Sequence, residues 1–453
     1  MRYVYERNGR GCITKVTYHA NNDPNISSSA VADADGVWGV EYDLDILNRV
    51  VSLYYLNKDG SHHRNKIGVA SRDYKYDETG RISESRSCGL HGNLVLNEYM
   101  FAYAVVEHDE YGNSLEERYY DTNGEPCLIK GGCAKWVSKY DDRGNEIERA
   151  FYGVDGEPCL HNDGNAKWVS KYDDRGNMIE CAYYGVDGEP CLHNDGYAKW
   201  VSKYDARGNE IESAFYGVDG KPCLINNGNA KWVSKYDDRG NEIERAFYGV
   251  DGKPRFIKDG YAKMCYIYDE RGNAVEESYY DIYDNPCLSN SKFARGVVKY
   301  DDRGNMIEWS FYGVDGKLCL HSDGYAKSIF RYDARGNEIE RAFYGVDGEP
   351  CLINYGYAKY AYEYDDRGNR TERSYYGVDG KPCLIKDGYA KYVKKYDERG
   401  NELESSFYGV DGKPCLHSEG YARYVYGYDA WGNCVSLTVY DDKGNDITSR
   451  YIN

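Results

Sequence analysis

The sequence is short of positive charge and of long apolar runs. Its 453 residues carry 57 Lys and Arg against 75 Asp and Glu, so the formal net charge is −18. Proteins that bind nucleic acid draw most of their affinity from Lys and Arg that neutralise phosphates. No stretch approaches the ~20 apolar residues of a membrane-spanning helix. We therefore expect no nucleic-acid partner and no insertion into a membrane.

The first residues lack the apolar segment of a secretory signal peptide. Met1–Glu6 leads directly into repeat-like sequence, without the apolar core that such a peptide requires. The expected location is therefore the cytoplasm, with export by a route that uses no cleaved signal as the alternative. Because cytoplasmic thiols are kept reduced, the 15 cysteines are expected to be free.

Signals for α-helices are missing as well. No ten-residue stretch combines helical periodicity with helix caps, which favours an all-β fold. Leu, Ile and Val are sparse, whereas Tyr is abundant at 51 residues. The core must therefore consist largely of aromatic rings, each of which buries about 150–250 Å² and, in Tyr, carries a hydroxyl that needs a partner.

What the sequence does contain is a repeat of 32 residues. In ten copies its Tyr-Asp anchor begins at Tyr140, Tyr172, Tyr204, Tyr236, Tyr268, Tyr300, Tyr332, Tyr364, Tyr396 and Tyr428. His108 and Tyr76 continue this register towards the N-terminus, and Tyr42 and Tyr5 begin looser copies. The pattern predicts one continuous array of about fourteen units, because repeats contact mainly their neighbours.

The regularity of the repeat divides the chain into three parts. We expect residues 1–103 to form a divergent N-terminal cap that contains an insertion loop at residues 21–37. Residues 104–421 form the regular array, and residues 422–453 form a C-terminal capping repeat. Divergent end repeats are expected, since an end unit faces water on one side.

Each unit contains three turn signals with short segments between them. Asp173–Gly176 has the Asp and Gly spacing of a type I turn in a bulged hairpin, and Gly185–Gly188 and Asn194–Gly196 are the other two turns. Asn177–Tyr184 and Tyr197–Tyr204 have the length of strands. These segments predict a β-hairpin in every repeat.

A third segment, Glu189–His193, leaves two architectures open. If it lies outside the sheet, the hairpins form an elongated superhelical ribbon or solenoid. If it is a third strand, each repeat is one coil of a three-sided parallel β-solenoid. We favour hairpins, because Asp-x-x-Gly-Asn reverses the chain direction.

Comparison of the copies separates constant from variable positions. Ile179 and Glu180 recur almost without change, whereas the positions of Trp168, Ser170 and Cys181 differ from copy to copy. Because free variation is typical of exposed positions, we expect these three to lie on a variable, exposed face. A protein partner is expected to lie along that face.

The Tyr-Asp motif resembles a known repeat family. Tyr236–Glu244 is similar to the YD repeat of bacterial Rhs proteins, and Phe247–Lys253 resembles more weakly the repeats of cell-wall- and glucan-binding modules. The first resemblance implies β-hairpin ribbons that coil into shells or surface structures. The rigid 32-residue period and the Pro-Cys-Leu half of each unit depart from the Rhs pattern.

Cysteine forms a ladder in register with the repeat, at Cys127, Cys159, Cys191, Cys223, Cys287, Cys319, Cys351, Cys383 and Cys415, with Arg255 as the exception. The pattern predicts a small, buried, stacked side chain. A metal site with the His of Cys-Leu-His, as in Cys191 and His193, and cross-linked thiols are the alternatives. Since neighbouring units often have Ile in the His position, we expect no metal and no cofactor.

Charged side chains also recur at the repeat spacing. A partly buried Glu180 needs a cation, and Lys199 or Arg175 is the expected partner. Asp and Asn at the turns are explained by turn capping, with calcium as the alternative. An active site breaks repeat symmetry and these patterns do not, so we expect no catalytic residues and no enzymatic activity.

An aromatic stripe supplies the candidate binding residues. Its members are Trp136, Trp168, Trp200, Trp232, Trp309, Tyr360, Tyr392 and Tyr424. Exposed rings at repeat spacing can anchor a protein or stack on sugars, whereas half-covered rings simply pack between units. The expected function is a non-enzymatic scaffold that binds a protein partner. The alternatives are a carbohydrate- or cell-wall-binding module and an Rhs-like shell or surface structure.

Overall fold

The computed structural model describes residues 2–19, 37–428 and 434–451, so most of the expected insertion loop lies outside the described residues. Apart from one 3₁₀-helix, every regular element there is a β-strand. No helix of the described chain is long and apolar enough to cross a membrane. The chain divides into two compact units, with the boundary between Asn226 and Asn227.

The strands of unit 1 are β1 (Arg2–Arg7), β2 (Ile13–His19), β3 (Gly39–Leu44), β4 (Val50–Leu56), β5 (Ser71–Tyr76), β6 (Ile82–Cys88), β7 (Tyr103–His108), β8 (Ser114–Tyr120), β9 (Lys135–Tyr140), β10 (Glu146–Tyr152), β11 (Lys167–Tyr172), β12 (Met178–Tyr184), β13 (Lys199–Tyr204) and β14 (Glu210–Tyr216). The elements of unit 2 are β15 (Lys231–Tyr236), β16 (Glu242–Tyr248), β17 (Lys263–Tyr268), β18 (Ala274–Tyr280), β19 (Arg295–Tyr300), β20 (Met306–Tyr312), β21 (Lys327–Tyr332), β22 (Glu338–Tyr344), β23 (Lys359–Tyr364), β24 (Arg370–Tyr376), β25 (Lys391–Tyr396), β26 (Glu402–Tyr408), β27 (Arg423–Tyr428), β28 (Cys434–Tyr440) and the helix η1 (Thr448–Arg450).

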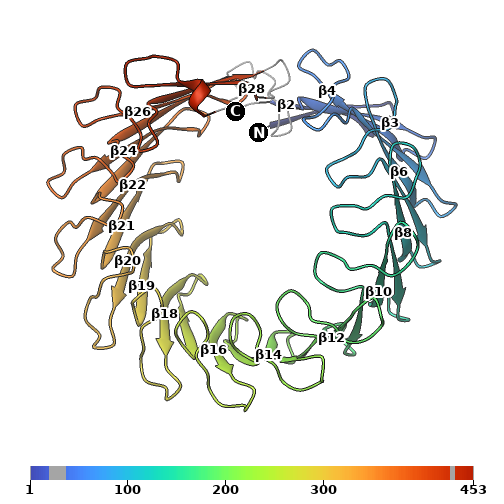
Figure 1. The fold of residues 1–453 in the computed structure, drawn as a ribbon, viewed down its shortest axis with the longest axis horizontal. Helices are drawn as coiled ribbons and strands as arrows, with labels where there is room; N and C mark the ends of the chain where they lie inside the picture. The colour runs from blue at the N-terminus through green and yellow to red at the C-terminus, as the bar shows by residue number, and fades with distance from the viewer. Residues whose placement is uncertain (1, 20–36, 429–433, 452–453) are drawn as a thin grey trace. The chain divides into compact units, whose positions relative to one another are not determined.

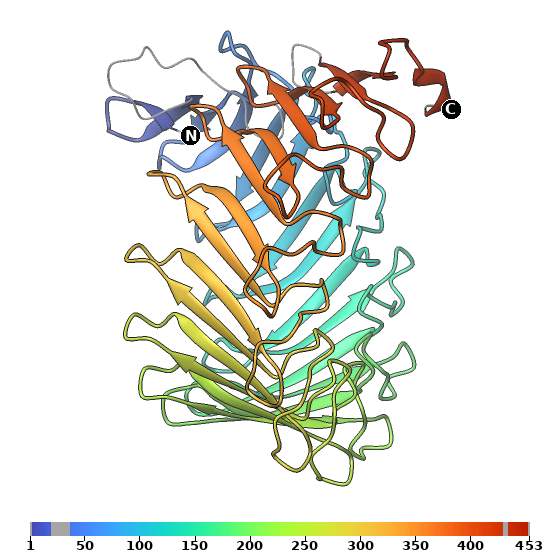
Figure 2. The same cartoon turned by 90° about the vertical axis from the view of Figure 1, so that its left-hand side faces the viewer.

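Within each unit, every strand pairs antiparallel with the next strand along the chain (Figure 1). Successive hairpins therefore lie side by side in one sheet per unit, as Figure 2 also shows. Two strands per repeat give fourteen hairpins among the described residues. The predicted tandem hairpins are confirmed, and the antiparallel pairing excludes the parallel solenoid.

The turn between β11 and β12 shows why the repeat folds as a hairpin. The Asp173 amide donates to the carbonyl of Asn177 at 2.9 Å, and the Gly176 amide donates to the carbonyl of Asp173 at 3.1 Å. Gly176 has φ of +87°, which glycine adopts without steric cost. The register shifts between Lys171 and Tyr172, so the predicted bulged hairpin is confirmed.

The Pro-Cys-Leu segment lies outside the sheet. It makes only an isolated bridge between Tyr184 and Pro190, and the Cys191 amide donates to the carbonyl of Tyr183 at 3.0 Å. The predicted Gly185–Gly188 turn reverses the chain so that this segment folds back along the end of β12. Each repeat is therefore a hairpin followed by a loop.

Fewer backbone positions pair between adjacent hairpins than between the two strands of one hairpin. β11 and β12 pair over six positions, but β12 and β13 pair over only three. The Tyr-Asp tyrosines add to this junction, because the Tyr204 hydroxyl donates to the carbonyl of Met178 at 3.0 Å. The same bond, spanning 26 residues, is made by Tyr76, Tyr140, Tyr172, Tyr268, Tyr300, Tyr332, Tyr364, Tyr396 and Tyr428.

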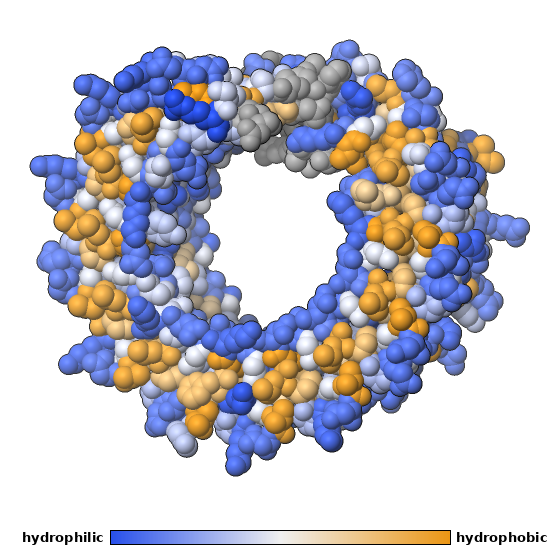
Figure 3. All heavy atoms as spheres, viewed as in Figure 1, coloured by the Kyte–Doolittle hydropathy of each residue, from blue (hydrophilic) through white to orange (hydrophobic). Residues whose placement is uncertain are grey.

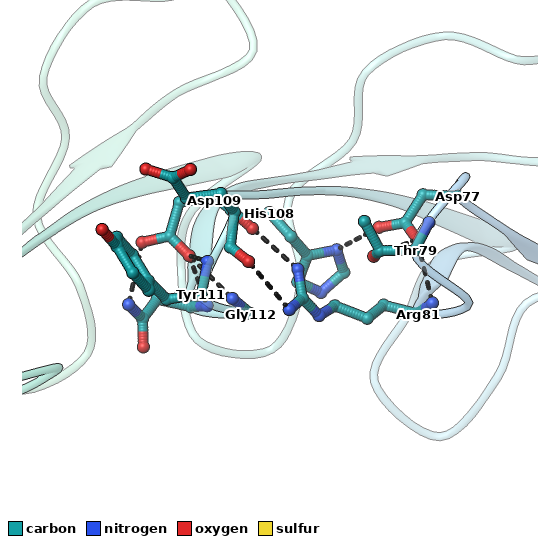
Figure 4. A network of polar contacts seen from close by, with 9 residues as sticks. Asp77, Thr79, Arg81, His108, Asp109, Tyr111 and Gly112 are labelled. Atoms are coloured by element: carbon teal, nitrogen blue, oxygen red, sulfur yellow. Dashed lines mark hydrogen bonds and ion pairs between the residues drawn. The ribbon is translucent and has the colours of Figure 1, made fainter.

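Arginine links one hairpin turn to the next. Figure 4 shows Arg81 reaching from its own turn to that of the following hairpin. Its Nη1 donates to the carbonyl of Asp109 at 2.7 Å, and its Nη2 donates to the carbonyl of Glu110 at 3.2 Å. Arg143, Arg175, Arg239, Arg271, Arg303, Arg335 and Arg367 make the equivalent link.

The sheet has two unlike faces. Opposed residues share a face, so the pairs Trp168–Tyr183 and Ser170–Cys181 lie together. We call this the covered face, because the loop of each repeat packs on it. The opposite face, with Lys171 opposite Glu180, is the charged face.

On the charged face, the recurring Glu residues pair with cations, and Glu180, Glu340 and Glu404 each lie between two. Glu180 lies 2.8 Å from the Lys171 ammonium and 3.7 Å from that of Lys199. Burial alone raises the pKa of Glu180, but the hydrogen bonds and charges of these lysines outweigh it and lower the pKa. The prediction that Lys199 pairs with Glu180 is confirmed. The alternative partner, Arg175, instead donates to the carbonyl of Asp205 in the next turn.

Aromatic side chains form the core on the covered face. In unit 1, Tyr119, Trp136 and Phe151 belong to one buried cluster. In unit 2, a longer cluster extends from Phe293 to Ile447. The core is thus built from aromatic rings, as predicted, in tilted and edge-on contacts. Other tyrosines, such as Tyr184 beside the Lys167 ammonium, lie on the charged face.

We predict that removing one Tyr-Asp hydroxyl weakens the junction between repeats. Tyr204→Phe deletes the hydrogen bond to Met178, and one such bond contributes about 0.5–1.5 kcal/mol. The urea midpoint of unfolding should therefore fall. Tyr216→Phe is the matched control, since Tyr216 lies under the Lys199 ammonium, a contact that Phe preserves. Equal midpoints for Tyr204→Phe and the wild type would contradict this role.

Acid should destabilise the hairpin turns. The amide of the Asn four residues further on is the main cause that lowers the pKa of Asp141, Asp173, Asp205, Asp237, Asp269, Asp301, Asp333 and Asp441. The hydroxyl of Thr79 lowers the pKa of Asp77 to about 2. Asp in an unfolded chain has a pKa of ~3.9.

These lowered values set the direction of the pH dependence. The stabilisation that these Asp carboxylates give the folded protein is fully present above about pH 4. It is lost as the pH falls through their folded-state pKa values, towards about 2. Thermal unfolding followed by circular dichroism should show a midpoint that declines across this window. A midpoint that stays constant or rises there would contradict the prediction.

Candidate functional site

The aromatic stripe lies on the covered face. Trp136 and Tyr360 are less than a tenth exposed. The other six, Trp168, Trp200, Trp232, Trp309, Tyr392 and Tyr424, are half-buried. Their surroundings are those of core residues, since Trp309, Tyr392 and Tyr424 pack against the buried cluster of unit 2.

The prediction that the variable positions are exposed is wrong. Ser170 is 2% exposed and Cys181 is 5% exposed, and both face the loop that covers the sheet. Variation at these positions therefore reflects different ways of filling the same interior space. It does not mark a surface open to a partner.

Unit 2 shows how the variable positions compensate for one another. Gly296 occupies the Trp168 position, and its would-be Cβ would lie 2.8 Å from Glu277 Oε1 and 3.1 Å from Trp309 Nε1. The side chains of the neighbouring strands thus occupy the space that a larger residue would need. A small residue on one strand is therefore compensated by larger side chains on the neighbouring strands.

The residue before the recurring Ala-Lys follows a similar rule. It is aromatic in most regular repeats, as at Tyr197, but it is Cys133, Asn165 or Asn229 in three of them. In two of these three repeats an arginine lies at the Cys181 position. Arg149 stacks over the Trp136 ring at 4.2 Å and Arg245 over the Trp232 ring at 4.5 Å.

The repeat of Asn165 lacks both the aromatic ring and the arginine. Asn165, Ser170 and Cys181 are all small, and a cavity of about 250 Å³ lies beside them. The cavity is lined by Phe151, Asp163, Asn165, Trp168, Ser170, Met178, Cys181, Tyr183, His193 and Trp200. The 32-residue symmetry is thus broken in unit 1 at a cavity that is partly open to solvent.

Half of the residues that line the cavity are aromatic or thioether side chains, and the other half carry polar groups or a thiol. Asn165 is 2% exposed, and its Nδ2 has no hydrogen-bond partner among the described residues. His193 Nδ1 lies 3.2 Å from the Asp195 carboxylate. Burial raises the pKa of the Cys181 thiol, so this cysteine is a neutral wall residue. Apolar walls with a few convergent polar groups are typical of small-molecule sites.

The cysteine ladder lies outside the cavity and has a bonding role. The Cys191 thiol donates to the carbonyl of Gly164 in the preceding repeat at 3.7 Å. At the exceptional position, Arg255 Nε donates to the equivalent carbonyl of Gly228 at 2.8 Å. The ladder cysteines are half-buried, so the prediction of a buried ladder is wrong. The position instead supplies a hydrogen-bond donor to the neighbouring loop.

The residues of the alternative metal and calcium sites are engaged in other contacts. His193 packs against the Tyr183 ring, with centroids 4.8 Å apart. Both oxygens of Asp173 accept hydrogen bonds from its own turn, two from backbone amides and one from the Asn177 side chain. Across residues 2–19, 37–428 and 434–451, no group of three or more His, Cys, Asp or Glu is placed to hold a metal ion.

Two variable positions carry buried carboxyl groups. Burial raises the pKa of Glu117 and of Glu277. The Tyr279 hydroxyl donates to Glu277 Oε2 at 2.8 Å, and this bond moderates the increase. These groups stand singly in the core, so they form no acid–base pair.

The cavity could have been found from the sequence only by comparing two positions together. Asn165 is one of three departures from an aromatic residue, and Cys181 is where the other two repeats carry Arg. Neither change is unusual by itself. Their coincidence in one repeat is the signal, and it acquires meaning once both positions are known to lie on one face.

The fold and these interactions define the chain as an all-β tandem-repeat protein built from antiparallel hairpins. A comparison with protein-family models found no match, and neither did a comparison with curated proteins.

Solved structures that cover most of the chain include the TcdB2-TccC3-TEV and TcdB2-TccC3 crystal structures. Their TM-scores are 0.34 and 0.27, each at 11% identity over 98% of this chain and over 26% and 25% of theirs. The Photorhabdus luminescens Tc holotoxin pore has a TM-score of 0.26 at 11% identity, over 98% of this chain and 24% of the other. The chain thus spans about a quarter of the length of these structures.

The cysteine ladder should react slowly with thiol reagents in the folded protein. All 15 thiols are free, and burial, the main cause, raises the pKa of Cys287 to about 11. At pH 8 about one such thiol in a thousand is the reactive thiolate. Cys434 is exposed and should be alkylated first by iodoacetamide.

Peptide mass spectrometry after timed alkylation measures the order of reaction. Unfolding in urea is the control, because it should bring all the cysteines to similar rates. If the ladder cysteines react as fast as Cys434 in the folded protein, or are found in disulfides, the assignment of half-buried donor thiols is wrong.

Proposed function

We propose that this protein is a non-enzymatic repeat scaffold that binds a protein partner along a row of exposed apolar side chains. The row consists of the Val of the second turn and the Leu that follows the ladder Cys. We call it the apolar ladder. In unit 1 its exposed members are Leu128, Val154, Leu160, Val186, Leu192, Val218 and Leu224. In unit 2 they are Val250, Phe256, Leu288, Val314, Leu320, Val346, Leu352, Val378, Leu384, Val410 and Leu416.

The persistence of these exposed residues is the observation that carries the proposal. Val186 is 53% exposed and Leu192 is 51% exposed, so neither owes its recurrence to a filled core. Single exposed apolar residues are ordinary, but a row of them forms a patch of the kind that marks interaction sites. Figure 3 shows hydrophobic side chains gathered in repeated patches bordered by hydrophilic ones.

The spacing of the ladder favours an extended partner. Each repeat adds two strands, and strands lie about 4.7–4.9 Å apart, so successive rungs are about 9.5 Å apart at the sheet. Three residues of a polyproline-type segment span about 9.3 Å. A protein segment with an apolar side chain at every third position would therefore meet several rungs in register.

The variable face, where the sequence suggested that the partner lies, is a poorer support for this function. Its residues are covered, as Ser170 and Cys181 show. A ladder that repeats unchanged suits a partner lying along several repeats better than side chains that differ in each. The YD-type turns support a shell or surface structure, as in Rhs repeats, as the alternative setting for the scaffold.

Sugar binding by the aromatic stripe is the alternative with less support, because sugar stacking needs an open ring face. Trp136 and Tyr360 offer almost none. A glycan array together with tryptophan fluorescence separates the two functions. Glycan signals accompanied by a fluorescence change would favour the sugar-binding module.

We predict that polar substitution of the ladder abolishes partner binding and leaves the fold intact. Leu160→Ser, Leu192→Ser and Leu224→Ser together remove the leucines of three successive rungs, which are 52%, 51% and 38% exposed. Affinity capture with the full chain, followed by quantitative mass spectrometry, should show a partner retained by the wild type and lost from the triple variant.

A matched triple variant controls for surface change in general. Asp142→Ser, Asp174→Ser and Asp238→Ser together alter three exposed positions in the hairpin turns, away from the ladder. This control variant should retain the partner. Capture of the partner by both triple variants, or by none of the three proteins, would contradict the proposal.

A further inference from the structure

We propose that the cavity beside Asn165 binds a small phenol-bearing molecule whose ring takes the place of the tyrosine ring that this repeat lacks. The proposed ligand site is inside unit 1, on the covered face, and it is separate from the exposed apolar ladder. It is therefore independent of the proposed partner binding.

The position follows from the neighbouring repeat. There, Tyr197 fills the place equivalent to Asn165, with its ring 5.8 Å from that of Tyr183 and 5.1 Å from that of Phe215. One repeat earlier, the corresponding neighbours are Phe151 and Tyr183. Both line the cavity, so the aromatic partners of a tyrosine ring are present where the ring itself is missing.

The volume is sufficient for a substituted benzene. An apolar cavity of about 150 Å³ in another protein holds benzene, and this one measures about 250 Å³. In the two other repeats without the aromatic residue, Arg149 and Arg245 supply the missing bulk. Cys181 is too small to do so, so the space beside it stays available to a ligand.

The unpartnered amide of Asn165 in the cavity favours a phenol over other aromatic molecules. Asn165 is only 2% exposed, and its unpartnered Nδ2 gains a hydrogen bond when a hydroxyl reaches it. A phenol hydroxyl both donates and accepts. A buried donor that finds its partner only in the complex favours ligands that carry this group over those that lack it.

A hexose fits the same walls less well. Its hydroxyl groups each need a hydrogen-bond partner when they leave water. Phe151, Trp168, Met178, Tyr183 and Trp200 make up half of the lining and offer mostly ring and thioether surface. In the polar half, the Ser170 hydroxyl already donates to the Met178 sulfur at 3.5 Å, and His193 Nδ1 accepts from the Asp195 amide at 3.3 Å. One aromatic ring with one hydroxyl matches this balance of apolar and polar groups.

Ligand-observed NMR titration of the full-length protein with p-cresol tests the proposal. We expect saturable binding of p-cresol, about five- to tenfold weaker binding of toluene because it lacks the hydroxyl, and no binding of glucose. Asn165→Ala should still bind both aromatic probes but should lose the preference for p-cresol.

Two variants taken from the chain's own repeats should close the cavity. Asn165→Tyr restores the usual ring, and Cys181→Arg copies Arg149 and Arg245. Each should weaken p-cresol binding at least about tenfold, since the site is filled. Tyr197→Phe is the matched control, because it alters the same position of the next repeat and should bind p-cresol like the wild type.

Circular dichroism establishes that each variant retains its strands, and two independent filling variants keep the test decisive if one of them fails to fold. The proposal is overturned if the wild type does not bind p-cresol saturably. It is equally overturned if a folded filling variant binds p-cresol as the wild type does, or if glucose binds in preference to it.

Discussion

The short backbone junction between repeats is the constraint on which the rest of the structure depends. Within a hairpin six positions pair, but β12 and β13 pair over only three. Side chains add to the backbone hydrogen bonds, such as that of the Tyr183 amide to the Ala198 carbonyl, that hold each hairpin to the next. The Tyr204 hydroxyl, the Arg175 guanidinium and the Cys191 thiol each bond to a backbone carbonyl of an adjacent repeat. Since each bond has to span the same distance in every copy, the residues that make them recur with a fixed period.

The same constraint explains why the covered face tolerates variation. Once the backbone is fixed by its junctions, the interior needs only to be filled, and several combinations of side chains fill it. Gly296 beside Trp309 is one combination, and Trp136 beneath Arg149 is another. Interiors are close-packed and leave few voids larger than a water molecule. A repeat in which neither the ring nor the arginine is present therefore stands out, and Asn165 with Cys181 is that repeat.

The sequence predicts the hairpins well because their signals are local. Asp173 and Gly176 fix the turn, and the recurring tyrosines fix its register. The faces could not be assigned in the same way. A shift of one residue moves a side chain to the opposite face, and the bulge between Lys171 and Tyr172 introduces such a shift. Nor does a period reveal on which face the Pro-Cys-Leu loop packs. Variation at Ser170 and Cys181 therefore predicts exposure from sequence alone, whereas long-range packing buries both.

Repeat symmetry separates two kinds of site in this protein. A surface that contacts an extended partner must present the same group in each repeat, and the half-exposed Val186 and Leu192 positions do so. A site for one small molecule must instead differ from the other repeats, because an identical pocket in each would be filled by the residue that the core requires. Asn165 together with Cys181 meets this second condition: like Asn229, Asn165 leaves a buried amide without a partner among the described residues, but its repeat has no arginine like Arg245 to fill the space beside it. The constant exposed positions of Val186 and Leu192 and the exceptional buried position of Asn165 are thus the two features that folding alone does not require.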